Sequence, residues 1–177
     1  MNMDSFRQNQ YSKANAVKYA IIYALKPNPA YRYFPLTNNN TSGDCANFVS
    51  QCLHAGGAPM NYSTRNPWWY RHSSININRD TWSISWAVAN SLYWYLKINQ
   101  ASHLPGAKGL EVQNVSLLKP GDLIFFEDNK GFVFHSTIVT SLLHNKPLIS
   151  HHSFEALNIP YQSSWPAYKM HFLKISI

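Results

Sequence analysis

The stretch DCANFVSQCLHAGG, residues 44–57, decides the fold that the sequence predicts. Its apolar side chains recur at intervals of three and four residues, which is the spacing of one helix face: Cys45, Phe48, Val49, Cys52 and Leu53. Asp44 suits the N-cap of such a helix, and Gly56-Gly57 suits its end. We therefore expect a buried helix from Cys45 to about Ala55, with a cysteine at its first position.

Two more helices are predicted on either side of this one. The first covers residues 12–25 and ends before Lys26-Pro27-Asn28-Pro29, because proline interrupts helices. The other covers residues 83–98 and carries Trp86, Leu92, Tyr93 and Leu96. Residues 31–43 and 58–82 lack periodicity, so both segments are predicted to be loops.

After Pro105-Gly106 the pattern changes to short runs rich in β-branched and aromatic residues. Strands are predicted over residues 122–127, 132–142, 148–153 and 167–175. Helices followed by strands predict an α+β fold, with N-terminal helices packed on a C-terminal antiparallel sheet. No repeat or linker interrupts the sequence, so residues 1–177 are expected to form a single domain.

The composition narrows the class of protein. The 177 residues are 45% apolar, 15% aromatic and only 13% charged, which is typical of a densely packed chain rather than a disordered one. The formal charge of +7 attracts polyanions such as nucleic acid, anionic lipid and anionic cell-wall polymers. The basic residues are scattered singly, so a solvated basic surface is favoured and no dedicated nucleic-acid site is expected.

Hydropathy and cysteine spacing indicate whether the chain has a membrane span, a signal peptide or a disulfide. No stretch approaches the roughly 18 apolar residues of a membrane span, so none is expected. Residues 1–13 lack the apolar core of a signal peptide. If the protein acts in the cell wall or elsewhere outside the cytoplasm, we expect it to leave the cell by another export route or with a leader that this sequence does not contain. Cys45 and Cys52 lie about 10 Å apart along one helix, beyond disulfide reach, and are predicted to be free thiols.

Cys45 is a candidate nucleophile, because the dipole and free N–H groups of a helix N-terminus favour the thiolate. A cysteine on an apolar helix face could equally belong to the core. His135 lies in an otherwise apolar and hydroxylated strand, where an imidazole needs a partner. A nucleophile on an early helix and a histidine on a later strand form the arrangement that cysteine–histidine catalysis uses.

The segment from Gly43 to Leu53, followed by Ala55-Gly56-Gly57, resembles the signature of the putative amidase domain family. This family is a branch of the papain-like cysteine hydrolases related to the NlpC/P60 and CHAP cell-wall enzymes. Further segments follow the family's order, so the resemblance covers nearly the whole chain: residues 11–20, 28–31, 68–70, 82, 119–124 and 135–139.

The resemblance implies a papain-like fold that needs neither metal nor cofactor. It implies Cys45 as nucleophile, His135 as general base and acid, and a polar residue on the next strand that orients the imidazole. Its better-known relatives cut peptide or amide bonds in bacterial peptidoglycan, so peptidoglycan or a peptide is the expected substrate.

The orienting residue is predicted from strand pairing. If Leu143 pairs with Leu148 across the turn, the register of the two strands is fixed. In that register the strand period of two places His152, and not His151, on the face that carries His135. An odd change of register would reverse the choice.

Three further residues are candidates for substrate binding. Trp68 and Trp69 could line a cleft, and packing in the core is an equal alternative. The backbone N–H of Cys45 is a natural donor to an oxyanion. Asn39, in the loop just upstream, is the candidate for a second donor, although plain turn residues are the simpler interpretation of Asn38 to Asn40.

Three alternatives to a cysteine hydrolase stay open. An acyltransferase would pass the same thioester to an amine. A zinc amidase would use some of the eight histidines, but the sequence has neither HExxH nor CxxC spacing. A non-catalytic module would hold its basic and aromatic surface against a cell-wall polymer or nucleic acid.

Overall fold

Apart from the short β1–β2 pair, the helices come first in the chain and the strands afterwards. The computed structural model describes residues 11–37 and 43–177. Its α-helices are α1 (Lys13–Tyr23), α2 (Cys45–Ala55), α3 (Ile84–Ala87) and α4 (Ala89–Ala101). Its strands are β1 (Tyr70–Arg71), β2 (Thr81–Trp82), β3 (Lys108–Val112), β4 (Leu123–Glu127), β5 (Val133–Leu143), β6 (Lys146–His151), β7 (Ala156–Pro160) and β8 (Lys169–Ser176). Short 3₁₀ turns cover Ile77–Arg79, Val115–Leu117 and Tyr161–Ser163.

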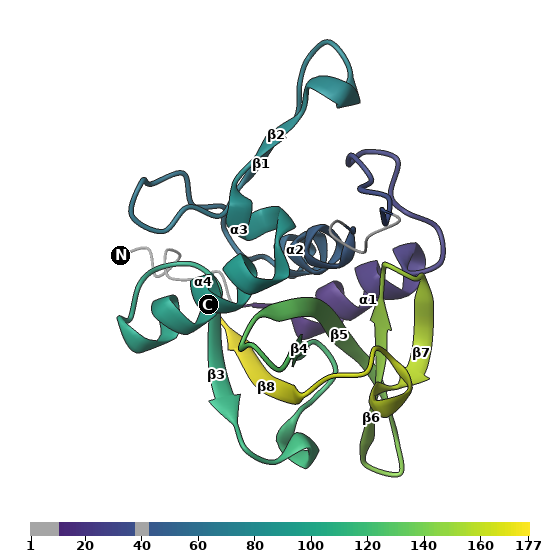
Figure 1. Ribbon diagram of the computed structural model, residues 1–177. Coiled ribbons are helices and arrows are strands. Elements are labelled where there is room, and N and C mark those ends of the chain that lie inside the picture. Colours follow the sequence, from purple (N-terminus) through teal and green to yellow (C-terminus); the bar gives the residue numbers. More distant parts are fainter. Residues whose placement is uncertain (1–10, 38–42) are drawn as a thin grey trace, which may run out of the picture.

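A six-stranded antiparallel sheet, in the order β3-β8-β4-β5-β6-β7, forms the C-terminal half. Figure 1 shows α1, α2 and α4 beside one another on one side of this sheet, with the β1–β2 pair extending away from it. The larger core joins Phe48 and Leu53 of α2 to Phe125 of β4, and a smaller one surrounds Phe126 and Ile149. Since successive strand residues face opposite sides, the two cores lie on the two faces of the sheet. The predicted packing of N-terminal helices on an antiparallel sheet is confirmed.

Helices α1 and α2 have close to the predicted bounds. The hydroxyl of Ser12 accepts a hydrogen bond from the Asn15 N–H at 3.2 Å and caps α1. Gly56 lets the two helices approach, because a Cβ there would lie 2.4 Å from the ring of Tyr11. Within the described segments, no helix is both long and apolar enough to cross a membrane.

The predicted helix over residues 83–98 is in fact two helices. Val88 separates α3 from α4, because its φ of −118° and ψ of 123° are those of extended backbone. Its side chain is 40% exposed. The interruption brings Ala87, Val88 and Ala89 to the wall of a cavity, described below.

The β5–β6 hairpin has a different register from the predicted one. Leu143 pairs with Lys146, and not with Leu148. A shift in register follows between Val139 and Ser141, after which Val139 pairs with Ile149. The predicted pairing is therefore wrong, and the change affects which histidine of β6 lies near β5.

Candidate active site

The first turn of α2 holds Cys45 beside strand β5. The cysteine is the first residue of the helix and is 7% exposed. The backbone N–H and the hydroxyl of Ser136 lie against its sulfur. This hydroxyl is a buried oxygen without a hydrogen-bond partner among the residues that the structure describes. His135 is the next residue along β5, and successive strand residues face opposite sides of a sheet, so the two predicted catalytic residues are related by the cavity that both of them line.

A cavity of about 700 Å³ opens at this place, and both Cys45 and His135 line it. Its other walls come from the segment before α2, from the α3–α4 junction, from the start of β5, and from Ser153 and Trp165. A volume of this size accommodates a small organic molecule or a short stretch of a chain. The geometry therefore gives the thiol and the imidazole access to a common ligand.

Burial dominates the chemistry of the Cys45 thiol. Loss of water raises its pKa above the ordinary value, against the lowering effect of the Ser136 N–H and hydroxyl. The carboxylate of Asp44 raises it further, and the Ala46 N–H lowers it. The helix N-terminus favours the thiolate, but desolvation outweighs the nearby donors, so the net shift of the Cys45 pKa is upward.

The His135 imidazole is buried and neutral. Burial lowers its pKa well below the ordinary value, and the neighbouring His151 lowers it further. Its Nε2 is a buried nitrogen without a hydrogen-bond partner among the described residues. A neutral imidazole that lines the same cavity as a neutral thiol can accept the proton that the thiol must lose.

His151, and not His152, is the neighbour of His135. The two rings are perpendicular, with centroids 4.7 Å apart. His151 Nδ1 lies 3.2 Å from the carbonyl oxygen of His152, so Nδ1–H donates there. Its Nε2, 3.2 Å from the Ser164 hydroxyl, is then the acceptor of that hydroxyl's proton. The predicted placement of His152 beside His135 is wrong, because the shifted register exchanges the faces of the two histidines.

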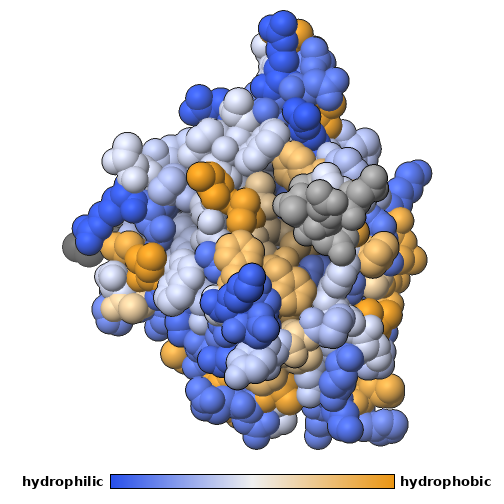
Figure 2. Space-filling model, viewed as in Figure 1, coloured by the Kyte–Doolittle hydropathy of each residue, from blue (hydrophilic) through white to orange (hydrophobic). Residues whose placement is uncertain are grey.

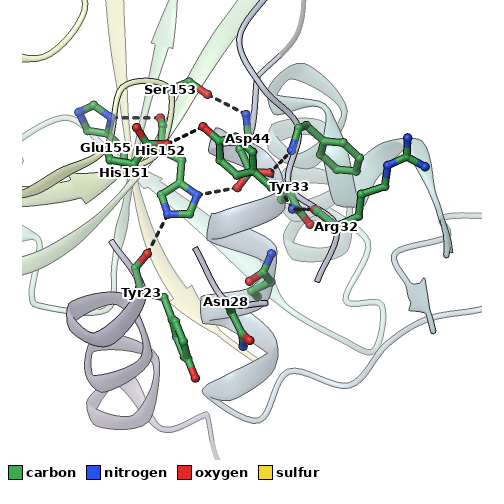
Figure 3. A network of polar contacts seen from close by, with 12 residues as sticks. Tyr23, Asn28, Arg32, Tyr33, Asp44, His151, His152, Ser153 and Glu155 are labelled. Atoms are coloured by element: carbon green, nitrogen blue, oxygen red, sulfur yellow. Dashed lines mark hydrogen bonds and ion pairs between the residues drawn. The ribbon is translucent and has the colours of Figure 1, made fainter. Parts of the chain in front are cut away.

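His152 points to the helices instead, as Figure 3 shows. Its Nδ1 lies 2.5 Å from the Asp44 carboxylate, and its Nε2 lies 2.9 Å from the carbonyl oxygen of Tyr23. Its ring stacks on Phe48, with centroids 4.1 Å apart. Both ring nitrogens thus lie at hydrogen-bonding oxygens, and the contact between His152 and Asp44 is buried on both sides. This pair ties the β6 end to α1 and α2.

Asp44 occupies the N-cap position, but its side chain makes no capping hydrogen bond. Its Oδ1 accepts from the Phe34 N–H at 2.9 Å and from the Asn47 amide at 2.8 Å. Its own N–H donates to the Ser153 hydroxyl at 2.7 Å. The predicted capping role is therefore wrong, and the residue instead anchors the segment before the nucleophile.

The predicted substrate-binding residues lie elsewhere. Trp68 is fully buried and donates from its indole to the Ser50 hydroxyl at 3.1 Å, so it is a core residue and the prediction for it is wrong. Trp69 stacks on Tyr62 outside the cavity lining. Asn39 lies outside the described residues. Aromatic walls come instead from Trp82 and from Trp165.

Comparison with known proteins places this site in a family. The model of the family described as "Putative amidase domain" matches residues 10–174. The uncharacterized protein YhbB of Bacillus subtilis (strain 168) is 37% identical over 154 residues, which cover 85% of this chain and 44% of YhbB. The uncharacterized protein YjcM of the same organism is 31% identical over 182 residues, which cover 90% of this chain and 37% of YjcM.

The chain thus spans less than half the length of either of these relatives. No solved structure matches it. The family match includes the helix that carries Cys45 and the strands that carry His135 and His151. On this match, which extends over nearly its whole length, the chain belongs to the putative amidase domain family, whose name indicates amide hydrolysis at a coarse level.

Proposed function

We propose that this chain hydrolyses amide bonds through a thioester on Cys45, with His135 as general base and acid. The observation that carries the proposal is the shared cavity. A cysteine at a helix start and a buried histidine with a partnerless nitrogen line the same space. These are the two groups that nucleophilic catalysis by a thiol requires.

In the first half of the reaction, the Cys45 sulfur attacks the carbonyl carbon of the amide while His135 takes the thiol proton. The carbonyl oxygen becomes an oxyanion. When the carbon–nitrogen bond breaks, the leaving nitrogen takes the proton from His135, and a neutral amine departs. The acyl group is now a thioester on Cys45.

In the second half, a water molecule attacks the thioester and His135 takes its proton. The thiolate leaves, the proton returns to sulfur, and a carboxylic acid is released. Both halves pass through an oxyanion at the start of α2. The backbone N–H of Cys45 is one of the N–H groups that a helix start leaves free, so it is suited to stabilise that charge.

The pKa shifts of Cys45 and His135 indicate the protonation of both groups before substrate binds. Burial disfavours the charged form of each group, so it raises the pKa of the Cys45 thiol and lowers that of His135. Thiol and imidazole are therefore both neutral before substrate enters. In this proposal the proton moves during the attack on the carbonyl and not before it.

The papain-like relationship, the single domain and the peptidoglycan or peptide substrate are parts of the same proposal. They rest on the resemblance of the Cys45 and His135 segments to that class. A location at the cell wall rests on the same argument. The chain spans less than half of its relatives, so the reaction of a longer protein that contains it is a proposal too.

The mechanism is tested by selective inactivation. Purified protein is assayed on peptidoglycan and on simple anilides after treatment with iodoacetamide or with EDTA. We expect iodoacetamide to abolish hydrolysis, with Cys45 in the alkylated peptide, and Cys45→Ala to be inactive but folded. Loss of activity with EDTA and its recovery with zinc would replace the cysteine mechanism with that of a zinc amidase.

Two controls distinguish a hydrolase from an acyltransferase and from a binding module. An added amine that captures the acyl group in place of water would show an acyltransferase, and mass spectrometry distinguishes the ligated product from free acid. Cys45→Ala protein that still performs the whole biological function would show a binding module. Cys52 is fully buried in the same helix, so Cys52→Ala serves as the matched thiol control.

A further inference from the structure

The cavity beside Cys45 has uncharged walls. None of the described residues that line it is Asp, Glu, Lys or Arg. Among the described lining residues, the polar side-chain groups besides those of Cys45 and His135 are the hydroxyls of Thr37 and Ser153 and the indole N–H groups of Trp82 and Trp165. Five of the lining residues are aromatic rings of phenylalanine or tryptophan: Phe34, Trp82, Phe132, Phe134 and Trp165.

The apolar wall continues outward to the protein surface. Val88 and Phe132 line the cavity and are 40% and 49% exposed. Phe154 is 67% exposed and stacks on Trp165, with centroids 5.4 Å apart. Figure 2 shows apolar side chains gathered around a hollow at the centre of this face, within a mainly hydrophilic surface. A contiguous exposed apolar area of this kind marks a binding site.

These walls discriminate between possible acyl groups. An apolar group that leaves water for this cavity gains about 25 cal/mol for each Å² of its surface that is buried. A carboxylate or ammonium group would lose its hydration there without finding an opposite charge, which costs several kcal/mol or more. The cavity thus favours a neutral apolar group over the charged side chains of a cell-wall peptide.

The acyl part of the substrate is the part that stays longest in the site. It remains bonded to the Cys45 sulfur until water arrives, whereas the amine leaves after the first half. Contacts between the cavity and the acyl group therefore act in both halves of the reaction.

We propose, on the basis of the amide hydrolase mechanism above, that the acyl group of the substrate is uncharged and apolar. A fatty acyl chain and an apolar amino-acid residue share this chemistry. Both would lie against Trp82, Val88 and Phe132, with the scissile carbonyl at Cys45.

The test varies the acyl group on a constant leaving group, p-nitroaniline. Butanoyl and succinyl anilides form the matched pair, because a terminal methyl in one replaces a terminal carboxylate in the other. We expect kcat/KM to be at least tenfold higher for butanoyl. A further rise with octanoyl would indicate a fatty acyl source, and a rise with N-acetylphenylalanyl a peptide source. Equal or faster cleavage of the succinyl anilide would overturn the proposal.

A binding measurement separates this proposal from the mechanism on which it rests. Octanoyl and succinyl anilides are titrated into Cys45→Ala protein, with Trp82 and Trp165 as fluorescent reporters in the cavity wall. Selective binding of octanoyl anilide without hydrolysis by the wild type would refute the mechanism alone. Hydrolysis by the wild type without apolar preference would refute the acyl proposal alone. Neither binding nor hydrolysis would refute both.

A charge placed in the wall gives a second test. Val88→Lys should lower the kcat/KM ratio of butanoyl to succinyl anilide by at least tenfold, since the ammonium group would meet the succinyl carboxylate. Ile84→Lys is the control, because Ile84 is 70% exposed on α3 and does not line the cavity. An unchanged ratio in a folded Val88→Lys protein would contradict the proposal.

Discussion

The imidazole of His151 stands perpendicular to that of His135, at a centroid distance of 4.7 Å, and both rings are buried. His152, the next residue, faces the other way and pairs with Asp44. Two adjacent histidines thus occupy different environments. One borders the proposed general base, and the other joins the start of α2 to the rest of the fold.

His151→Ala is expected to lower turnover without removing the nucleophile. Loss of the ring would leave His135 less firmly positioned, and residues that orient a catalytic imidazole contribute on the order of 10- to 1,000-fold. Alkylation of Cys45 by iodoacetamide should persist, and the fall should appear in kcat rather than KM. His151→Phe keeps a flat ring against His135 and should recover part of the rate. Wild-type kcat in His151→Ala would show that the neighbouring ring plays no part.

His152→Ala is expected to reduce stability instead. It leaves the Asp44 carboxyl group buried without this partner, and removing one partner of a buried pair costs roughly 3–5 kcal/mol. Urea denaturation at neutral pH measures the loss. If the urea midpoint of unfolding is the same for His152→Ala and wild type, the contact between His152 and Asp44 contributes nothing to the stability of the fold.

The register of the β5–β6 hairpin could not be predicted from the sequence. His144 and Asn145 both have positive φ, so the hairpin turn has two residues rather than the four predicted. The shorter turn shifts the partner of each β5 residue by two positions along β6 relative to the prediction. A shift of two leaves every side chain on the same face of the sheet. The shift between Val139 and Ser141 moves the pairing by one residue and exchanges the faces of His151 and His152. A single bulge residue leaves no periodic signal, so the sequence could not reveal it.

Helix α2 was predicted residue for residue, because a local apolar stripe and two glycines define it. Of the six strands in the large sheet, the two that were not predicted, β3 and β7, are its edges. Edge strands are less buried than central ones, so neither β3 nor β7 has the apolar run of a central strand. Strand β7 also ends in Pro160, a residue typical of edge strands. The burial of Trp68 and the cavity position of Trp82 depend on tertiary packing and have no local signature.

The pH dependence of Cys45 alkylation should report the raised pKa of the thiol. Only the thiolate reacts, and burial holds the pKa of Cys45 above its ordinary value. The thiolate fraction should therefore rise about tenfold per pH unit from pH 6 to 8, with no plateau in this range. The rate with iodoacetamide is measured on Cys52→Ala protein, so that a single thiol reports. A plateau near pH 6 would instead show a preformed thiolate–imidazolium pair.

Cys52→Ala should cost stability and leave chemistry intact. The side chain is fully buried in α2, so its removal leaves a small cavity worth roughly 1–3 kcal/mol. Cys45→Ala should keep more of its stability, because the sulfur there borders an existing cavity. Urea denaturation of the two variants gives the comparison. Loss of hydrolysis in folded Cys52→Ala protein would show that our assignment of the reaction to Cys45 is wrong.

The basic composition should produce salt-dependent binding to anionic wall polymers. Exposed charges interact weakly beyond about 8 Å at physiological ionic strength, so the affinity of a protein with net charge +7 should fall as salt rises. Co-sedimentation with purified wall material at increasing NaCl concentrations measures it. Retention that does not change between low and high salt would show that the net charge is incidental.

Acid should weaken the contact that joins the edge strand β3 to α4 and β8. Partial burial raises the pKa of Glu111, but hydrogen bonds from Lys97 at 2.6 Å and His171 at 2.6 Å outweigh it and bring the pKa to about 2. A folded-state pKa below the unfolded value of 4.5 means that the unfolded chain binds the proton more readily. The stabilisation is therefore complete above pH 4.5 and is lost as the pH falls towards 2.

Glu111→Gln makes this loss measurable. The free energy of unfolding of the variant, from urea denaturation, should lie below that of the wild type at pH 7, and the difference between them should shrink from pH 5 to pH 3. Lys97→Met removes the cation at 2.6 Å from the carboxylate, so the pKa of Glu111 should rise and the loss should begin at higher pH than in the wild type. Curves for wild type and Glu111→Gln that stay parallel from pH 7 to pH 3 would show that the carboxylate keeps its ordinary pKa in the fold.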